Sequence, residues 1–246
     1  MSGSLFDGVA GAYAISRPTY PDALYDAIGS ALGRPFSVID AVDVGAGTGI
    51  GTAAFVARGA TVVAVDPARR MLSELIAAVP AARAICADGN HLPLGTAVAD
   101  LVTYAQALHW TDPERSVPEA LRLLRPGGVL AAWWNVPDFE VPWVADQRDR
   151  LCAASPSYHG FAGSDLGERL GGPPFRLRAE HHRFWWSRQL SPEQHVTMLG
   201  TQSYIAALAD PERTAFLEAE LVLLRKLFPN GMLIEPYVTR LTIAYR

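Results

Sequence analysis

A glycine-rich turn between a strand and a helix constrains this chain more than any other stretch. Residues Val38–Val44 are mostly apolar and rich in β-branched side chains, which favours a buried parallel strand. Residues Ile50–Arg58 are rich in alanine and apolar residues, which predicts a helix. A strand that turns directly into a helix is typical of an open α/β sheet, where ligands bind at the carboxyl ends of strands. Because glycine has no Cβ, we expect Gly45, Ala46 and Gly47 to form the floor of a binding site.

The spacing of the glycines and the acid before them indicate which ligand binds. A dinucleotide fingerprint, Gly-x-Gly-x-x-Gly, requires a third glycine where this chain has Ile50. The pattern is instead Gly-x-Gly-x-Gly, and Asp43 stands two residues before its first glycine. An acid at this point attracts a cationic ligand and repels a pyrophosphate. The turn resembles the first motif of the class I S-adenosylmethionine-dependent methyltransferases, whose cofactor carries a sulfonium cation. An ordinary turn that binds nothing is the alternative.

The N-terminal residues place aromatic, basic and proline side chains at a distinctive spacing. The run Tyr-x-x-x-Arg-Pro-x-Tyr-Pro consists of Tyr13, Arg17, Pro18, Tyr20 and Pro21. It resembles the N-terminal cap of small-molecule methyltransferases. By this resemblance Tyr13 and Arg17 bind the cofactor, and Arg17 holds its carboxylate through a charge-assisted contact. A surface arginine on a helical flap is the alternative. Pro21 suits a helix start, so we expect a helix over residues 22–32 within a cap formed by residues 1–34.

The second predicted strand, residues 60–66, also ends in an acid. The separation of Gly45 and Asp66, roughly 20 residues, suits one strand–helix–strand step, and an acid there accepts two ribose hydroxyls. NAD enzymes and methyltransferases share this feature, so it does not distinguish them. Asp66 before Pro67 also suits a helix cap. Met71 lies one turn further on, where it would pack either on an adenine or in the core.

A short third strand, residues 83–87, precedes Asp88 and Gly89. The resemblance implies that Asp88 accepts a hydrogen bond from the adenine amino group and that the backbone at Gly89 reads the ring edge. A turn aspartate is the alternative.

The fourth strand, residues 99–105, leads into Gln106-Ala107-Leu108-His109-Trp110. This run resembles the fourth motif of methyltransferases that act on small acids and natural products, which places Gln106 at the cofactor. His109 is the candidate general base, because imidazole titrates near neutrality. Alternatively, His109 only bonds to backbone and holds the loop.

The remainder of the chain completes the predicted fold. Leu-Arg-Pro-Gly-Gly, a further methyltransferase landmark, ends a helix at Leu124 and precedes a fifth strand over residues 129–134. Two late strands are expected over residues 175–188 and 233–245. We therefore predict one α/β domain over residues 1–246, with a Rossmann-like seven-stranded, mostly parallel sheet, helices on both faces and an antiparallel last strand. Residues 35–135 form its cofactor-binding core, and residues 136–174 and 189–232 are substrate-side insertions.

Composition excludes several other classes of protein. Half of the 246 residues are hydrophobic, 19% are charged and the net charge is −4, so the chain is globular and has no basic field for nucleic acid or membranes. Its two cysteines form no Cys-x-x-Cys pair, and residues 1–10 do not resemble a signal peptide, so we expect a cytoplasmic protein, monomeric or homodimeric. Neither His181-His182 nor any acidic cluster predicts a metal site, so we expect no metal.

The predicted function is transfer of a methyl group from S-adenosylmethionine to a small molecule, through a carboxylate, hydroxyl, amine or carbon nucleophile. The demethylated product would be S-adenosylhomocysteine. Two alternatives remain at this stage: an NAD(P)-dependent oxidoreductase, and an S-adenosylmethionine-binding protein that does not methylate.

Overall fold

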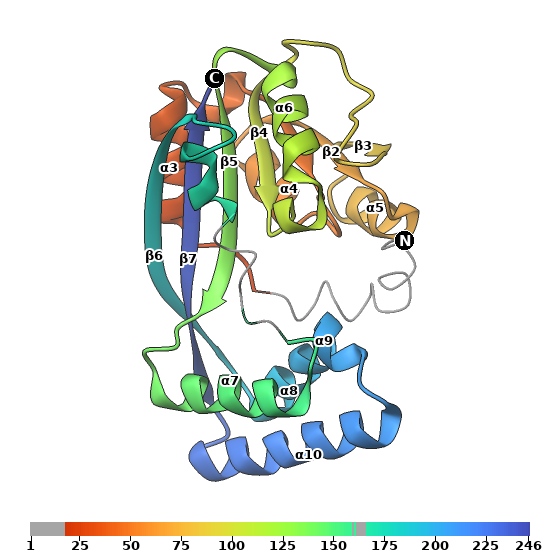
Figure 1. Cartoon of the computed structure of the whole chain (residues 1–246), viewed down its shortest axis with the longest axis vertical. Helices are drawn as coiled ribbons and strands as arrows, with labels where there is room; N and C mark the ends of the chain where they lie inside the picture. The colour runs from red at the N-terminus through yellow and green to blue at the C-terminus, as the bar shows by residue number, and fades with distance from the viewer. Residues whose placement is uncertain (1–17, 159, 161–165) are drawn as a thin grey trace.

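The computed structural model describes residues 18–158, 160 and 166–246. Its strands form one seven-stranded sheet in the order β3-β2-β1-β4-β5-β7-β6 (Figure 1). The strands are β1 Asp40–Val44, β2 Thr61–Asp66, β3 Arg83–Cys86, β4 Ala99–Ala105, β5 Leu124–Pro137, β6 Arg178–Leu190 and β7 Leu233–Tyr245. Strands β1 to β5 pair in parallel, whereas β7 runs antiparallel to both of its neighbours. The predicted sheet with its antiparallel last strand is confirmed.

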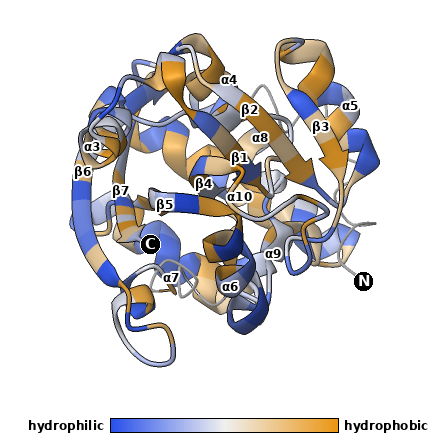
Figure 2. Ribbon diagram, turned by 90° about the horizontal axis from the view of Figure 1, so that it is seen from above, coloured by the Kyte–Doolittle hydropathy of each residue, from blue (hydrophilic) through white to orange (hydrophobic). Residues whose placement is uncertain are grey.

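Helices cover both faces of this sheet (Figures 1 and 2). The helices are α3 Asp22–Leu32, α4 Ile50–Ala57, α5 Arg69–Ala78, α6 Pro113–Leu123, α7 Pro142–Ala154, α8 Pro192–Gly200, α9 Ser203–Ala206 and α10 Asp210–Leu227. The described residues also form the short 3-10 helices η1 Phe36–Val38, η2 Leu108–Trp110 and η4 Glu168–Gly171. Figure 2 also shows that much of β6, the outer strand of the sheet, is hydrophilic. No described helix is both long and apolar enough to cross a membrane.

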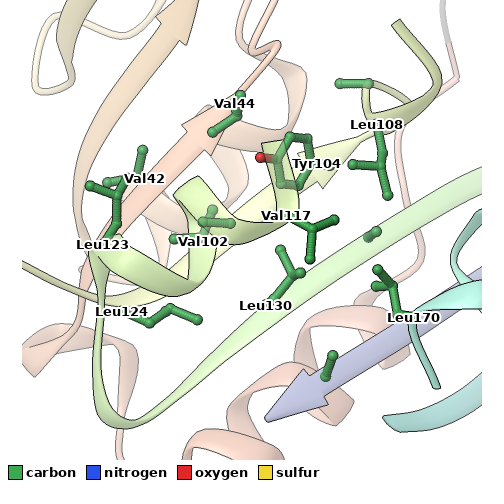
Figure 3. Close-up of a cluster of buried hydrophobic side chains, with 14 of the residues drawn as sticks. Val42, Val44, Val102, Tyr104, Leu108, Val117, Leu123, Leu124, Leu130 and Leu170 are labelled. Carbon is green, nitrogen blue, oxygen red and sulfur yellow. The ribbon is translucent and has the colours of Figure 1, made fainter. Parts of the chain in front are cut away.

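Alternating side chains of the strands divide the core between the two faces. Val42 and Val44 of β1 pack with Val117 of α6 in one cluster (Figure 3). Ala41, which points to the other face, belongs to a cluster with the apolar side of α3. Both faces of the central strands are therefore covered, and most residues of β1, β2 and β4 are buried.

A second layer of helices, α7 to α10, lies beyond the carboxyl ends of β1, β4 and β5 (Figure 1). Strands β6 and β7 are 13 residues each, and Figure 1 shows them extending from the sheet to this layer. The layer has its own apolar clusters. One of them joins Leu190 and Leu233, at adjoining ends of β6 and β7, to Leu224 of α10. The long strands thus hold the helical layer opposite the glycine-rich turn.

Several predicted boundaries were wrong. Residues Arg125–Gly128, expected to form a turn before the fifth strand, belong to β5, which begins at Leu124. The register between β4 and β5 shifts there, and Gly127 has a φ of +80°, so the strand contains a bulge rather than a separate turn. Strand β1 begins only at Asp40, because the preceding residues form η1. The expected helix over residues 201–209 shortens to α9.

Candidate functional site

A cavity of about 520 Å³ lies at the carboxyl ends of the parallel strands. One part of its wall comes from the glycine-rich turn and the ends of β2 and β4, and the opposite part comes from α7, α8, α9 and the start of β7. Its size is that of a typical small-molecule site. The cavity is also where a Rossmann-like sheet is expected to bind ligands.

The glycines of the turn have separate roles. A Cβ added to Gly45 would lie 2.4 Å from the Cβ of Ala107, so Gly45 permits close packing of the turn on the segment after β4. A Cβ added to Gly47 would meet nothing within 4 Å, and Gly47 borders the cavity. Both residues have positive φ, 70° and 57°, which favours glycine. Gly45 therefore shapes the turn, whereas Gly47 leaves room in front of it.

Asp66 at the end of β2 fixes the turn from the side. Its two carboxylate oxygens accept hydrogen bonds from the backbone N–H groups of Gly47, at 2.9 Å, and Ala68, at 2.8 Å. Burial raises the pKa of Asp66, and these two hydrogen bonds oppose the rise. Each oxygen retains a lone pair for a ligand in the cavity. Asp66 is thus a cavity residue, but it is not the helix cap that the sequence also suggested, because α5 begins at Arg69 with Ala68 at its N-cap and no side-chain cap hydrogen bond.

The other predicted cofactor residues of the core also border the cavity; they are Ala46, Pro67, Met71, Asp88, Gly89 and Gln106. A Cβ on Gly89 would lie 2.9 Å from a methyl carbon of Val44, so only glycine fits there without a shift. Gln106 has a φ of +55°, an uncommon value for a residue with a side chain, and its N–H donates to the carbonyl of Trp133. Backbone strain of this kind is often found at functional sites.

Asp43 does not border the cavity. Its side chain is fully buried behind the turn, where Thr52 and Thr103 donate hydrogen bonds to its two oxygens at 2.7 and 2.8 Å. Burial raises the pKa of Asp43 to about 6, and these hydrogen bonds oppose the rise. Asp43 links β1, α4 and β4 through its hydrogen bonds, so it supports the turn from behind. It makes no contact with the cavity and can affect a ligand only through long-range electrostatics.

His109 borders the cavity from η2, between two tryptophans. Trp134 donates its indole N–H to Nδ1 of His109 at 3.1 Å, and the ring of Trp110 lies 4.8 Å away, centroid to centroid. Burial lowers the pKa of His109 to about 4, so the imidazole is neutral at pH 7.

The far wall of the cavity is aromatic and contains one buried polar network. Its rings are Phe139, Trp143, Tyr158, Tyr204 and Tyr237. In the network, His195 Nδ1 lies 2.7 Å from an oxygen of Glu235, and its Nε2 lies 3.0 Å from Oε1 of Gln147. Arg188 donates to the other oxygen of Glu235. Burial alone would raise the pKa of Glu235, but its contacts with His195 and Arg188 hold it below the usual range.

The sequence did not single out the residues of this network. His195 and Glu235 are isolated in the sequence, within a predicted helix and the predicted last strand. His195 and Gln147 lie in segments that were expected to be on the substrate side, whereas Glu235 does not. Tyr13 and Arg17, predicted to bind the cofactor, lie outside the described residues. Among the residues described, no group of three His, Cys, Asp or Glu side chains is arranged to hold a metal ion.

Comparison with known proteins identifies the family. A family model described as a methyltransferase domain matches residues 42–132. An uncharacterized methyltransferase of Mycobacterium tuberculosis (strain ATCC 25618 / H37Rv) is 34% identical over 237 residues, which cover 95% of this chain and 92% of that protein. The chain belongs to the class I methyltransferases. S-adenosylmethionine, the methyl donor of this family, is its cofactor.

Solved structures agree with this family. A structure assigned to a type II methyltransferase of Anaeromyxobacter dehalogenans aligns with a TM-score of 0.70 at 25% identity, covering 93% of this chain and 97% of the other. A methyltransferase from Thiobacillus denitrificans, solved with S-adenosylhomocysteine, shares the fold with a TM-score of 0.54 at 14% identity, covering 98% of each chain.

The cavity of this methyltransferase has the features that the cofactor requires. The open space before Gly47 admits a ligand close to the backbone, and Asp66 offers acceptors beside that space. Met71 supplies an apolar surface, and Asp88 supplies an acceptor in the same cavity. Asp66 would suit the ribose hydroxyls, Met71 a face of the adenine ring, and Asp88 the adenine amino group.

Proposed function

We propose that this methyltransferase transfers the methyl group of S-adenosylmethionine to a small-molecule acceptor. The observation that carries the proposal is the continuity of the cavity, which joins the glycine-rich turn to an aromatic chamber under α7, α8 and α9. A cofactor at the turn would direct its reactive end into this chamber only if the adenosine lay along β2 and β3. The positions of Asp66 and Asp88, at and just after the ends of those strands, support that placement.

The roles of individual residues follow from their positions. Asp66 would accept the ribose hydroxyls, Asp88 the adenine amino group, and the backbone at Gly45, Ala46 and Gly47 would border the amino-acid end. Tyr13 and Arg17 remain predicted cofactor-binding residues, with Arg17 as the partner of the cofactor carboxylate. The sulfonium supplies an electrophilic methyl group, and the protein contributes alignment and exclusion of water. The aromatic side chains of the far wall provide an apolar surface for the acceptor.

Calorimetric titration with S-adenosylmethionine, S-adenosylhomocysteine and NADH tests this proposal. We expect the first two to bind and NADH not to bind. Binding of NADH alone would support the oxidoreductase alternative and refute the proposal. If the two adenosyl compounds bind, incubation with methyl-labelled cofactor and a library of small acids, phenols and amines should yield a labelled product. A cofactor-binding protein without transferase activity would give none. The cytoplasmic location, the absence of a metal and a monomeric or homodimeric state remain predictions.

A further inference from the structure

The hydrogen bond between Trp134 and His109 determines which nitrogen of the imidazole is available to a ligand. An indole N–H can only donate, so Nδ1 of His109 must present a lone pair to Trp134. A neutral imidazole with its lone pair at Nδ1 carries its single hydrogen on Nε2. No described residue makes a hydrogen bond with Nε2, and the ring borders the cavity. His109 therefore offers the cavity an N–H donor and no free basic nitrogen.

This tautomer argues against the general-base role expected from the sequence. A base at His109 would have to accept a proton at Nδ1, which would expel the indole N–H of Trp134 from its buried hydrogen bond. The low pKa of His109, which burial causes, makes that protonation still less favourable near neutral pH.

The other titratable groups of the far wall are also unsuited to accept a proton. Glu235 is occupied on one oxygen by His195 and on the other by Arg188, which stabilises its charged form. Both ring nitrogens of His195 are already engaged, Nδ1 with Glu235 and Nε2 with Gln147. Burial raises the pKa of Tyr158 to about 12, so its hydroxyl stays protonated.

The remaining described acids lie on the cofactor side of the cavity. Asp66 accepts hydrogen bonds from two backbone N–H groups of the turn region, and Asp88 accepts one from Asn90. The acceptor chamber bounded by described residues therefore provides hydrogen-bond donors and apolar rings. A methyl acceptor that contacts only these described residues has to arrive without a proton on its nucleophilic atom.

We propose that the acceptor is a carboxylate on an apolar or aromatic small molecule, and that His109 positions this carboxylate through its Nε2–H. Among common organic nucleophiles, carboxylic acids are fully deprotonated at neutral pH, whereas thiols, phenols and amines are mostly protonated. One carboxylate oxygen forms the new bond to the methyl carbon, and the electron pair of the broken carbon–sulfur bond stays on sulfur. The products are a methyl ester and a neutral thioether, and no proton is transferred. This inference rests on the proposed methyltransferase function.

The tautomer can be measured without any turnover. Long-range ¹⁵N–¹H correlation spectra of protein labelled at histidine distinguish a protonated Nε2 from a protonated Nδ1. The chain contains six histidines, so the spectrum of His109→Gln identifies the resonances of His109. We expect the Nε2–H form from pH 6 to pH 9, and a mixture of tautomers in Trp134→Phe, which lacks the indole donor. An Nδ1–H form, or a doubly protonated ring at pH 7, would overturn the inference.

The acceptor class can be measured by binding. Phenylacetate, 2-phenylethanol and phenethylamine share one aromatic body and differ in the polar group. Each would be titrated into the protein saturated with S-adenosylhomocysteine. We expect phenylacetate to bind at least about tenfold more tightly than the other two, a preference that His109→Ala reduces by about tenfold and His109→Gln largely restores.

The outcomes distinguish a failure of this inference from a failure of the proposed methyltransferase function. If S-adenosylhomocysteine itself does not bind, the proposed function fails. If it binds and the alcohol or the amine is preferred over phenylacetate, the methyltransferase assignment stands and the carboxylate inference is refuted. An unchanged preference in His109→Ala would refute the positioning role of His109.

Discussion

The different roles of Gly45 and Gly47 predict different effects of Ala substitution. Gly45→Ala should mainly lower stability, whereas Gly47→Ala should weaken cofactor binding. Gly33, Gly45 and Gly47 all have φ between 57° and 70°, so each Ala variant carries a backbone cost of about 1–2 kcal/mol. Only at Gly45 does the new Cβ clash, at 2.4 Å from Ala107, which adds about 1–3 kcal/mol. Gly33, the exposed C-cap of α3, meets no atom within 4 Å and lies outside the cavity, so it is the control.

The expected free-energy losses are therefore about 2–5 kcal/mol for Gly45→Ala and about 1–2 kcal/mol for Gly33→Ala and Gly47→Ala. For a chain of this length these losses correspond to Tm decreases of roughly 4–20 °C and 2–8 °C. Scanning calorimetry without ligand measures the stability, and titration with S-adenosylhomocysteine measures the affinity. We expect Gly47→Ala to weaken affinity and Gly33→Ala to leave it unchanged. A Gly45→Ala variant as stable as Gly33→Ala, or a Gly47→Ala variant with full affinity, would refute the reasoning.

Three further predictions concern single side chains. Asp66→Asn should weaken S-adenosylhomocysteine binding about tenfold or more in calorimetry, because an amide cannot accept from both backbone N–H groups that the carboxylate now holds. Leu224→Ala should cost about 2–5 kcal/mol in urea unfolding, because Leu224 is fully buried in the helical layer. Glu119→Gln should cost roughly 1 kcal/mol at pH 7, because Glu119 accepts hydrogen bonds from Arg122 and from a backbone N–H. The Arg122 contact lowers the pKa of Glu119 to about 2 from its usual 4.5, so this stabilisation is present above pH 4.5 and is lost as the pH falls toward 2.

Each of these predictions has a result that contradicts it. Unchanged affinity in Asp66→Asn would mean that the carboxylate is not needed at the turn. A loss below 1 kcal/mol in Leu224→Ala would mean that the helical layer unfolds separately or collapses around the gap. If the loss of unfolding free energy caused by Glu119→Gln stays constant from pH 6 to pH 3, the ion pair with Arg122 contributes nothing to stability.

The parallel half of the fold could be predicted because its signals are local. Most strands of this half are short and rich in apolar residues, and residues at or just after the ends of β1 to β4 border the cavity. Gly47, Asp66 and Asp88 border the cavity for that reason. Asp43 has the same type of signal, but alternation along β1 and the adjoining threonines direct its side chain into the protein interior.

The rest of the site depends on contacts between residues far apart in the sequence. His195 and Glu235 are 40 residues apart and meet only because the start of β7 passes beside α8. The tautomer that we infer for His109 depends on Trp134, which is 25 residues away on β5. No local pattern encodes these pairings, so the sequence identified a histidine at the cavity but could not indicate which of its ring nitrogens is engaged.

The position of β7 has a consequence for synthesis of the protein. This strand is translated after all the others, yet it lies between β5 and β6 and pairs with both. Until it emerges from the ribosome, β6 has no partner in the described sheet, and its Phe184-Trp185-Trp186 run is exposed in an unpaired strand. Unpaired strands of this kind promote aggregation, and long-range pairing is slow. The β5–β7–β6 part of the sheet can form only after β7 has emerged from the ribosome, so a nascent chain stalled before Leu233 should depend on chaperones to stay in solution.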